Sequence, residues 1–283
     1  MIKIGGRKIG WGYPPIISAE LSLNHQADLN LAIKMIDEVA EAGADAVKLQ
    51  YFKVEDFCTD KEKMVTYEQW LQDLLSGNAR KYGCRIVDGK LKSTLSEEVT
   101  ETEYELFKRH EISLDFVKAC QQRAKKKHLI FGVTPTSVKG VKELGALGID
   151  FFKIASDMIG KKEMLTEMGA YGIPKIISTG HLTLDEVRSY IINGKRWSWL
   201  WLHCVSEYPT INPQLWKIRH LQEFDCHVGY SDHTLGIESA IRAIELGATW
   251  VEKHFTSDKT LPGPDHWYSA DKEELTRLAK AVK

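Results

Sequence analysis

Eight short apolar runs are spaced along the chain, and each gives way to a polar or charged residue at its C-terminal end. A segment with helical spacing of apolar residues follows most of these runs. Eight strand-and-helix units are the number that closes a parallel α/β barrel, the (β/α)8 or TIM barrel, whose active sites lie at the C-terminal ends of the strands. We predict this fold, with strands at residues 16–20, 46–50, 129–134, 151–156, 175–179, 199–204, 227–233 and 249–254.

The crossover helices are expected where apolar residues recur at a spacing of three or four. In residues 28–42 the pattern is clearest, and Gly43 stands where a C-terminal glycine cap belongs. The other expected helices lie at about residues 112–127, 138–147, 161–171, 183–192, 213–223, 236–246 and 272–282.

Two further segments accompany the eight units. Ile2, Ile4 and Ile9 flank Gly5-Gly6, which predicts a hairpin within residues 1–15 that plugs the barrel floor. Residues 53–111 exceed any ordinary strand-to-helix connection, so we expect an insertion over the barrel mouth after strand two, with one or two helices and a mobile loop. It acts either as a lid or specificity element, or in structure and oligomerisation. The length of 283 residues predicts one domain, 1–283.

Composition excludes several classes of function. Lys and Arg number 38 against 39 Asp and Glu, so no general basic field favours nucleic acid or an anionic membrane as a partner. The five cysteines are widely spaced and no apolar signal segment begins the chain, which predicts a cytoplasmic protein. The most apolar stretch, residues 197–205, is much shorter than the roughly 20 residues of a membrane span.

Lysine side chains are expected inside the barrel. Because side chains alternate along a strand, Lys48 and Gln50 share one face, and Lys153 interrupts another apolar run. A buried charge is costly unless it is paired, so the two lysines indicate a small, multiply charged anionic ligand. The alternative is an internal salt bridge to Glu20 or Glu252.

Histidines end the sixth and seventh predicted strands, where side chains are expected to lie near the barrel mouth. His203 and His233 can converge from neighbouring strands and bind a divalent metal, or serve as hydrogen-bonded structural or acid–base groups. In the eighth strand, alternation makes Glu252 and His254 the inward pair. The stiff loop at residues 262–266 either presents Asp265 to the mouth or is only a rigid turn.

Eight motifs, in order and across nearly the whole chain, resemble the sialic acid synthase family, which includes synthases of N-acetylneuraminic, legionaminic and pseudaminic acids. They are Ile17-Ser-Ala-Glu-Leu-Ser-Leu-Asn-His25, Asp45-Ala-Val-Lys-Leu-Gln50, Phe152-Lys-Ile-Ala-Ser156, Ile177-Ser-Thr-Gly180, Leu202-His-Cys204, Gly229-Tyr-Ser-Asp-His-Thr234, Glu252-Lys-His-Phe-Thr256 and Pro262-Gly-Pro-Asp265. The resemblance implies a transferase that condenses phosphoenolpyruvate with the open-chain aldehyde of an N-acylated amino sugar, such as N-acetylmannosamine, and releases phosphate. The product would be a nine-carbon 2-keto-3-deoxy acid.

The resemblance also implies roles for individual residues. The phosphoenolpyruvate anion would be bound by Lys48, Lys153, Ser156, Ser178 and Thr134. A divalent ion, Mn²⁺ or Mg²⁺, would be held by His203 and His233. Around the reacting sugar and the water we place Glu20, Gln50, Asp157, Glu252 and His254 in catalysis, with Asp265 in substrate binding.

Two departures from the family pattern qualify these roles. Met158 stands where the family usually has an acidic residue, so either the neighbouring Asp157 acts instead, or Glu20 or Glu252 does, or turnover is impaired. Family members usually continue into a small C-terminal antifreeze-like domain, whereas this sequence ends at Lys283. We expect the insertion or a separate chain to bind the N-acyl group. The assembly would be either a homo-oligomer or a complex with a partner chain that replaces the C-terminal domain. The alternative functions are a synthase for a different aldose and a non-catalytic ligand-binding or assembly subunit.

Overall fold

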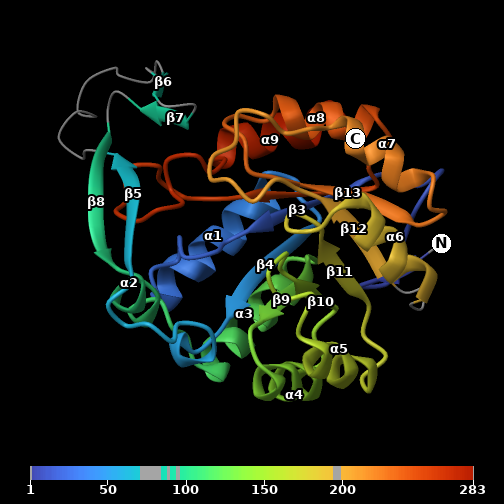
Figure 1. Ribbon diagram of the computed structural model, residues 1–283, viewed down its shortest axis with the longest axis horizontal. Coiled ribbons are helices and arrows are strands. Elements are labelled where there is room, and N and C mark those ends of the chain that lie inside the picture. Colours follow the sequence, from blue (N-terminus) through green and yellow to red (C-terminus); the bar gives the residue numbers. More distant parts are fainter. Residues whose placement is uncertain (1, 71–83, 88–89, 94–95, 194–198, 283) are drawn as a thin grey trace.

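A computed structural model describes residues 2–70, 84–87, 90–93, 96–193 and 199–282. Eight parallel strands close into a barrel in the order β10-β11-β12-β13-β14-β3-β4-β9, and helices surround it (Figure 1). The strands are β3 (Ile16–Glu20), β4 (Ala46–Tyr51), β9 (Ile130–Pro135), β10 (Phe151–Ile154), β11 (Lys175–Ser178), β12 (Trp199–His203), β13 (His227–Asp232) and β14 (Trp250–His254). The predicted TIM barrel is confirmed, strand by strand.

Each segment with helical spacing forms a helix. The helices are α1 (Leu29–Glu41), α3 (Leu114–Lys126), α4 (Val138–Leu147), α5 (Lys162–Gly169), α6 (Leu184–Asn193), α7 (Trp216–Gln222), α8 (Glu238–Glu245) and α9 (Lys272–Val282). Local signals explain their ends: the Asp28 carboxylate accepts hydrogen bonds from the first backbone N–H groups of α1, and Gly148 ends α4 in the left-handed conformation at φ 70°. None of the described helices combines the length and apolar character needed to cross a bilayer.

Strand alternation divides the core into two parts. Outward side chains of the strands, such as Val47, Phe131 and Trp201, pack against the helices in one large cluster. The inward side chains at the N-terminal half of the barrel form a second cluster with three isoleucines of the N-terminal hairpin, β1 (Ile2–Ile4) and β2 (Arg7–Ile9). The floor is therefore closed by an apolar plug, as the sequence predicts, and the polar inward side chains Glu20, Lys48 and Glu252 lie toward the C-terminal end of the barrel.

The insertion after β4 contains two short helices, as expected, and in addition antiparallel strand pairs that the sequence analysis did not predict. It contains the short helices η1 (Val54–Asp56) and α2 (Glu103–Lys108), and its main described feature is an antiparallel ribbon of β5 (Met64–Trp70) and β8 (Ser96–Thr102), beside α2 in Figure 1. A smaller pair joins β6 (Cys84–Val87) and β7 (Lys90–Ser93). β-Branched residues such as Val65 and Thr66, in alternation with polar ones, favour a ribbon over a helix. The expected mobile loop lies outside the described residues.

Candidate active site

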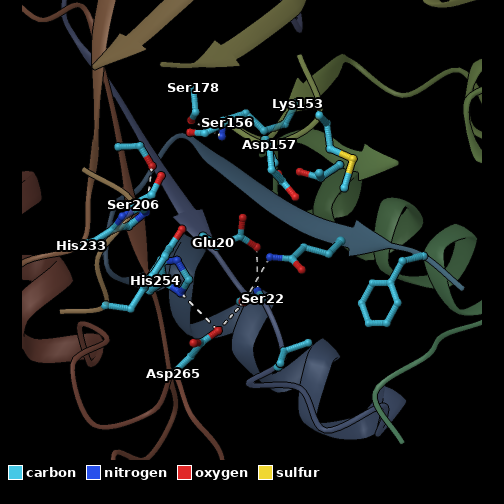
Figure 2. A pocket seen from close by; sticks show the side chains of 18 of the residues that line it. Glu20, Ser22, Lys153, Ser156, Asp157, Ser178, Ser206, His233, His254 and Asp265 are labelled. Atoms are coloured by element: carbon cyan, nitrogen blue, oxygen red, sulfur yellow. Dashed lines mark hydrogen bonds and ion pairs between the residues drawn. The ribbon is translucent and has the colours of Figure 1, made fainter. Parts of the chain in front are cut away.

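A cavity of about 520 Å³ opens at the C-terminal ends of the barrel strands. Its volume is within the range of small-molecule sites. All the site residues expected from the sequence line it except His203: Glu20, Lys48, Gln50, Thr134, Lys153, Ser156, Asp157, Ser178, His233, Glu252, His254 and Asp265. In Figure 2, Lys153, Ser156, Asp157 and Ser178 form one group, and His233, His254 and Asp265 approach from another side. The geometry brings the polar strand ends together as one site.

The two inward lysines are both buried and both paired. Lys48 forms an ion pair with Glu20 and donates a hydrogen bond to Thr134 Oγ1 at 2.8 Å. Lys153 Nζ lies 3.2 Å from Glu252 Oε1 and 2.7 Å from Ser178 Oγ. The internal salt bridges weighed from the sequence are thus formed, and both lie on the cavity wall, where an anion can reach the lysines.

Burial and neighbouring charges shift the pKa values of this group. Burial lowers the pKa of Lys48 to about 7, against the opposing effect of Glu252 and Asp265. Burial raises the pKa of Glu252, but Lys153 and Lys48 outweigh it and hold that pKa below its ordinary value. The second carboxylate oxygen of Glu252, Oε2, is buried and has no hydrogen-bond partner among the described residues. An unsatisfied acceptor beside two lysines marks the place where a polar ligand or water belongs.

His203 does not lie beside His233, and its expected place in the site is corrected. Its ring stacks on Tyr230 with centroids 5.8 Å apart, and its Nε2 contacts the Pro213 carbonyl at 2.8 Å, on the helix side of the strand. Alternation explains this, because Trp201 packs on the helices while Leu202 packs inside the barrel, so His203 points outward and Cys204 lines the cavity.

His254 takes the position beside His233, with ring centroids 5.6 Å apart. Burial lowers the pKa of each imidazole to about 3, so both are neutral at pH 7 and carry a free lone pair. His233 Nδ1 lies 2.7 Å from the Val205 carbonyl, and His254 Nδ1 lies 3.6 Å from Asp265 Oδ2. Each contact occupies Nδ1, the orientation in which metal-binding histidines present Nε2. Nε2 of His233 has only a long contact, 3.5 Å from Ser231 Oγ.

The donor set around these rings fits a divalent ion that keeps open positions. Among the described residues no group of three or more His, Cys, Asp or Glu side chains has metal-binding geometry. Two neutral imidazoles would therefore be the protein's ligands, and water or substrate oxygens would complete the shell. Tyr208 adds a ring over His233, with centroids 4.1 Å apart, a contact that no sequence pattern indicated.

A buried ion pair on the opposite face of the strands holds the two histidines in register. Asp232 and Lys253, both without exposed surface, lie 3.1 Å apart and precede His233 and His254 in the chain. Asp232 also accepts hydrogen bonds from the backbone and hydroxyl of Thr234. The pair joins the ends of β13 and β14, so Asp232 orients the site from outside and does not enter the cavity.

Ser22 connects the first strand to the loop after the eighth, and sequence reasoning missed it. Its backbone N–H donates to Glu20 Oε1 at 2.7 Å, and its hydroxyl donates to Asp265. Gln50 Nε2 donates to the same Ser22 hydroxyl at 3.2 Å. The φ of Ser22, 44°, is unusual for serine, and these hydrogen bonds stabilise that backbone conformation. Asp265 therefore does face the mouth, and its loop is more than a rigid turn.

The fourth and fifth strand ends supply a small polar pocket. Ser156 Oγ accepts a hydrogen bond from the backbone N–H of Gly180 at 2.9 Å and lies 3.3 Å from Cys204 Sγ. A Cβ at Gly180 would collide with Ser206 Oγ, so only glycine lets these hydroxyls approach. Asp157 lines the cavity with an exposed side chain, while Met158 lines it and packs into the core. Asp157 therefore supplies a carboxylate where the neighbouring methionine has none.

The insertion forms the remaining wall of the cavity. Its lining residues come from η1, the ribbon and α2 and are mostly apolar: Phe57, Val65, Tyr67, Glu103, Leu106 and Phe107. They meet Leu23 and Phe52, which follow β3 and β4, in a separate small apolar cluster. The cavity is thus polar over the barrel and apolar toward the insertion.

Known proteins share this architecture and much of the sequence. The chain is 34% identical over 276 residues to N,N'-diacetyllegionaminic acid synthase of Campylobacter jejuni, covering 95% of this chain and 74% of that protein. It is 30% identical to human N-acetylneuraminate-9-phosphate synthase, over 98% of this chain and 72% of that protein. The crystal structure of an N-acetylneuraminic acid synthetase from Leptospira borgpetersenii, in complex with citrate, superposes with a TM-score of 0.81 at 32% identity, over 99% of this chain and 87% of that one.

A family model matches the larger part of the chain directly. The match runs over residues 85–283, from within the insertion through the last six barrel strands to the end of α9. The relatives above extend the similarity through β3 and β4, which carry Glu20 and Lys48. The chain belongs to the NeuB family, and the two relatives named above are synthases of nonulosonic acids.

Proposed function

We propose that this protein condenses phosphoenolpyruvate with the open-chain aldehyde of an N-acylated amino sugar, giving a sialic-acid-like nonulosonic acid and phosphate. The observation that carries the proposal is the pairing of two buried, carboxylate-bound lysines with two neutral histidines in one cavity of a NeuB-family barrel. The lysines are suited to bind the phosphoenolpyruvate anion, and the histidines to hold a metal ion beside the aldehyde oxygen of the acceptor.

Lys48 and Lys153 would bind the anion by exchanging partners. Phosphoenolpyruvate offers a carboxylate and a phosphate, which replace the carboxylates of Glu20 and Glu252 as acceptors for the ammonium groups. The hydroxyls of Thr134 and Ser178 already bond to the lysines and can turn toward the ligand. Ser156 and the backbone N–H of Gly180 add donors. Because both lysines are already buried, the exchange requires no further desolvation of their ammonium groups.

The exchange also prepares the carboxylates for proton transfer. An anion placed beside Glu20 and Glu252 raises their pKa values, since like charges disfavour ionisation. Either group can then take a proton from the water that adds to the former enol carbon, while C3 of phosphoenolpyruvate bonds to the aldehyde carbon. The same proton can pass to the aldehyde oxygen, which becomes a hydroxyl. Phosphate leaves with cleavage of its C–O bond. Asp157, which faces the cavity, is the third carboxylate available for this role.

His233 and His254 would hold a Mn²⁺ or Mg²⁺ ion through Nε2. When bound, such an ion polarises the aldehyde of the acceptor as a Lewis acid. The protein orients the two imidazole rings: the Val205 carbonyl contacts Nδ1 of His233, and Asp265 contacts Nδ1 of His254. The Asp232–Lys253 ion pair joins the ends of β13 and β14, which carry these histidines. Asp265 and Gln50, joined through Ser22, lie where the sugar hydroxyls nearest the aldehyde would bind.

The test is a phosphate-release assay with purified protein, phosphoenolpyruvate, Mn²⁺ and a panel of N-acylated mannosamines, including diacylated 6-deoxy sugars. We expect phosphate only when an acceptor is present, together with a keto acid in equal amount. Lys153→Met should abolish release, while Asp157→Asn should lower kcat more than it raises the KM for phosphoenolpyruvate. Phosphoenolpyruvate binding without release from any acceptor would instead support a non-catalytic binding subunit.

A further inference from the structure

The apolar end of the cavity forms a continuous wall over the barrel mouth. We call it the acyl wall; it consists of Leu23, Phe52, Phe57, Val65, Tyr67, Leu106 and Phe107, all of which line the cavity. Two of these residues follow barrel strands and five belong to the insertion. Only two positions separate Phe52 from Gln50 of the polar site, and three separate Leu23 from Glu20. The wall therefore lies within reach of a substituent on a sugar bound at the strand ends.

Three phenylalanines give the wall a fixed shape. The rings of Phe52, Phe57 and Phe107 meet edge to face in all three pairs, with centroids 5.1 to 5.7 Å apart. This is the preferred geometry of aromatic pairs, and such pairs resist rearrangement. Phe52 is itself buried, and so are Leu23 and Leu106 of the same cluster. The wall is thus a packed surface with a defined limit.

The wall offers almost nothing to a hydroxyl group. Tyr67 carries its only polar side-chain atom, and that hydroxyl already donates to Glu101 at 2.6 Å and accepts from Arg109 at 3.3 Å. Glu103, the neighbouring polar residue of the cavity, forms an ion pair with Lys63 at 2.9 Å. A sugar hydroxyl pressed against this wall would lose its hydrogen bonds to water without replacement, which is unfavourable. An alkyl group would gain by leaving water.

From this contrast we infer that the acyl wall binds the alkyl part of the acceptor's N-acyl group and selects acceptors by the size of that group. The inference rests on the proposed function, because it assigns the acceptor to this cavity. It explains the chemical division of the site: the barrel half binds phosphate, carboxylate and hydroxyls, and the insertion half binds the alkyl part of the acyl group, which has no hydrogen-bonding atoms. Acyl selection thus resides in this chain's own insertion.

A series of acceptors that differ only in the N-acyl group measures the effect. With N-formyl, N-acetyl and N-propanoyl forms of one amino sugar, each added methylene should raise kcat/KM about fourfold until the wall is reached, as expected for burying one CH₂. Binding of the same sugars is measured by calorimetry, so the dependence on acyl size is observed even without turnover. The KM for phosphoenolpyruvate should not change along the series.

Variants of the ribbon provide a matched pair. Val65 and Thr66 are adjacent in β5 and point to opposite faces, and Thr66 bonds to Thr100 on the exposed face. Val65→Thr adds a hydroxyl to the wall without changing its volume and should reduce the propanoyl-to-formyl ratio about fivefold. Thr66→Val makes the reverse change away from the cavity and should leave the ratio unchanged. Phe107→Ala should extend the longest acyl group accepted.

The outcomes separate the inference from the proposed function. Equal kcat/KM and equal affinity for all acyl groups, or the same ratio in Val65→Thr as in wild type, would overturn the acyl wall while leaving the synthase intact. Acyl-dependent binding without phosphate release would support the wall and contradict the synthase. Failure of every sugar to bind or react would overturn both.

Discussion

The Lys153–Glu252 pair allows stability and ligand binding to be separated by mutation. Lys153→Met keeps most of the side-chain volume but leaves Glu252, which is 3% exposed, without its closest cation. Breaking a buried ion pair from one side typically costs about 3–5 kcal/mol. Lys48 also acts on Glu252, so we expect the lower end, about 3 kcal/mol, at pH 7.

The double variant Lys153→Met with Glu252→Gln should recover most of that loss. Replacing both charges removes the uncompensated carboxylate, and glutamine can still accept the hydrogen bond that Ser231 donates to Glu252 at 3.1 Å. We expect the double variant to lie within about 1 kcal/mol of wild type, because replacing both partners of a buried pair is close to neutral. Its affinity for phosphoenolpyruvate should nevertheless stay roughly 10- to 150-fold lower, the cost of a lost hydrogen bond to a charged group.

Urea unfolding from pH 5 to 8 and calorimetric titration with phosphoenolpyruvate check this cycle. In Lys153→Met, loss of the cation raises the pKa of Glu252 above its unfolded value, so the deficit relative to wild type should be largest at neutral pH and shrink as pH falls. A single variant as stable as wild type would refute the buried pair. A double variant with unchanged affinity would refute the assignment of Lys153 to the anion.

Three further predictions concern histidines and packing. His254→Gln should weaken Mn²⁺ binding, followed by electron paramagnetic resonance, by more than about 100-fold, whereas His203→Gln should bind Mn²⁺ like wild type; equal losses would contradict the pairing of His233 with His254. Burial lowers the pKa of His25 to about 4, below its unfolded value of 6.5, so the unfolded chain binds the proton more tightly and up to about 3 kcal/mol of stability should vanish between pH 6.5 and 4, a slope that His25→Asn should flatten in urea titrations. Gly132→Ala places a methyl group inside the ring of Phe151. The resulting overpacking should reduce the free energy of unfolding by about 1–3 kcal/mol or more and lower the thermal midpoint; an unchanged midpoint would show that the barrel floor can adjust.

The barrel was predictable because its signals are local and repeated. Each strand is a short apolar run, each helix has a periodic apolar face, and caps such as Asp28 and Gly148 mark the ends. The inward position of Lys48 or Glu252 followed from alternation, since a charged residue in an otherwise apolar strand shows which face is polar. Thr134, Ser156, Asp157 and Ser178 were assigned through the resemblance to a known family, and with them twelve of the expected residues line one cavity.

Where both faces of a strand are apolar, the alternation of side chains does not show which residues point into the barrel. His203 was misplaced for this reason. Trp199, Leu200, Trp201 and Leu202 precede it, so the sequence of β12 does not reveal which of them point inward. The resemblance to a family did not correct this, because the motif names a residue without its direction. Only the packing of Trp201 on the helices shows that His203 points away from the cavity.

The insertion was less predictable because its structure depends on pairing at long range. Residues 64–70 and 96–102 find each other across the intervening segment, and neither is an apolar run. The apolar residues of the cavity wall come from η1, β5 and α2, and only the folded chain brings them together with Phe52. The sequence likewise did not show which carboxylate pairs with Lys48 and which with Lys153, because those pairings depend on the folded barrel.

The central claim is that this cavity joins carbon atoms of phosphoenolpyruvate and an N-acylated amino sugar. Carbon-13 magnetic resonance with phosphoenolpyruvate labelled at C3 tests it most directly, in the presence of Mn²⁺ and the acceptor. We predict that the labelled methylene signal moves to that of a carbon bonded to the former aldehyde carbon, in step with phosphate release, and that Lys153→Met shows neither change. Phosphate release that leaves the label in pyruvate, or an unchanged spectrum with every acceptor, would contradict the account.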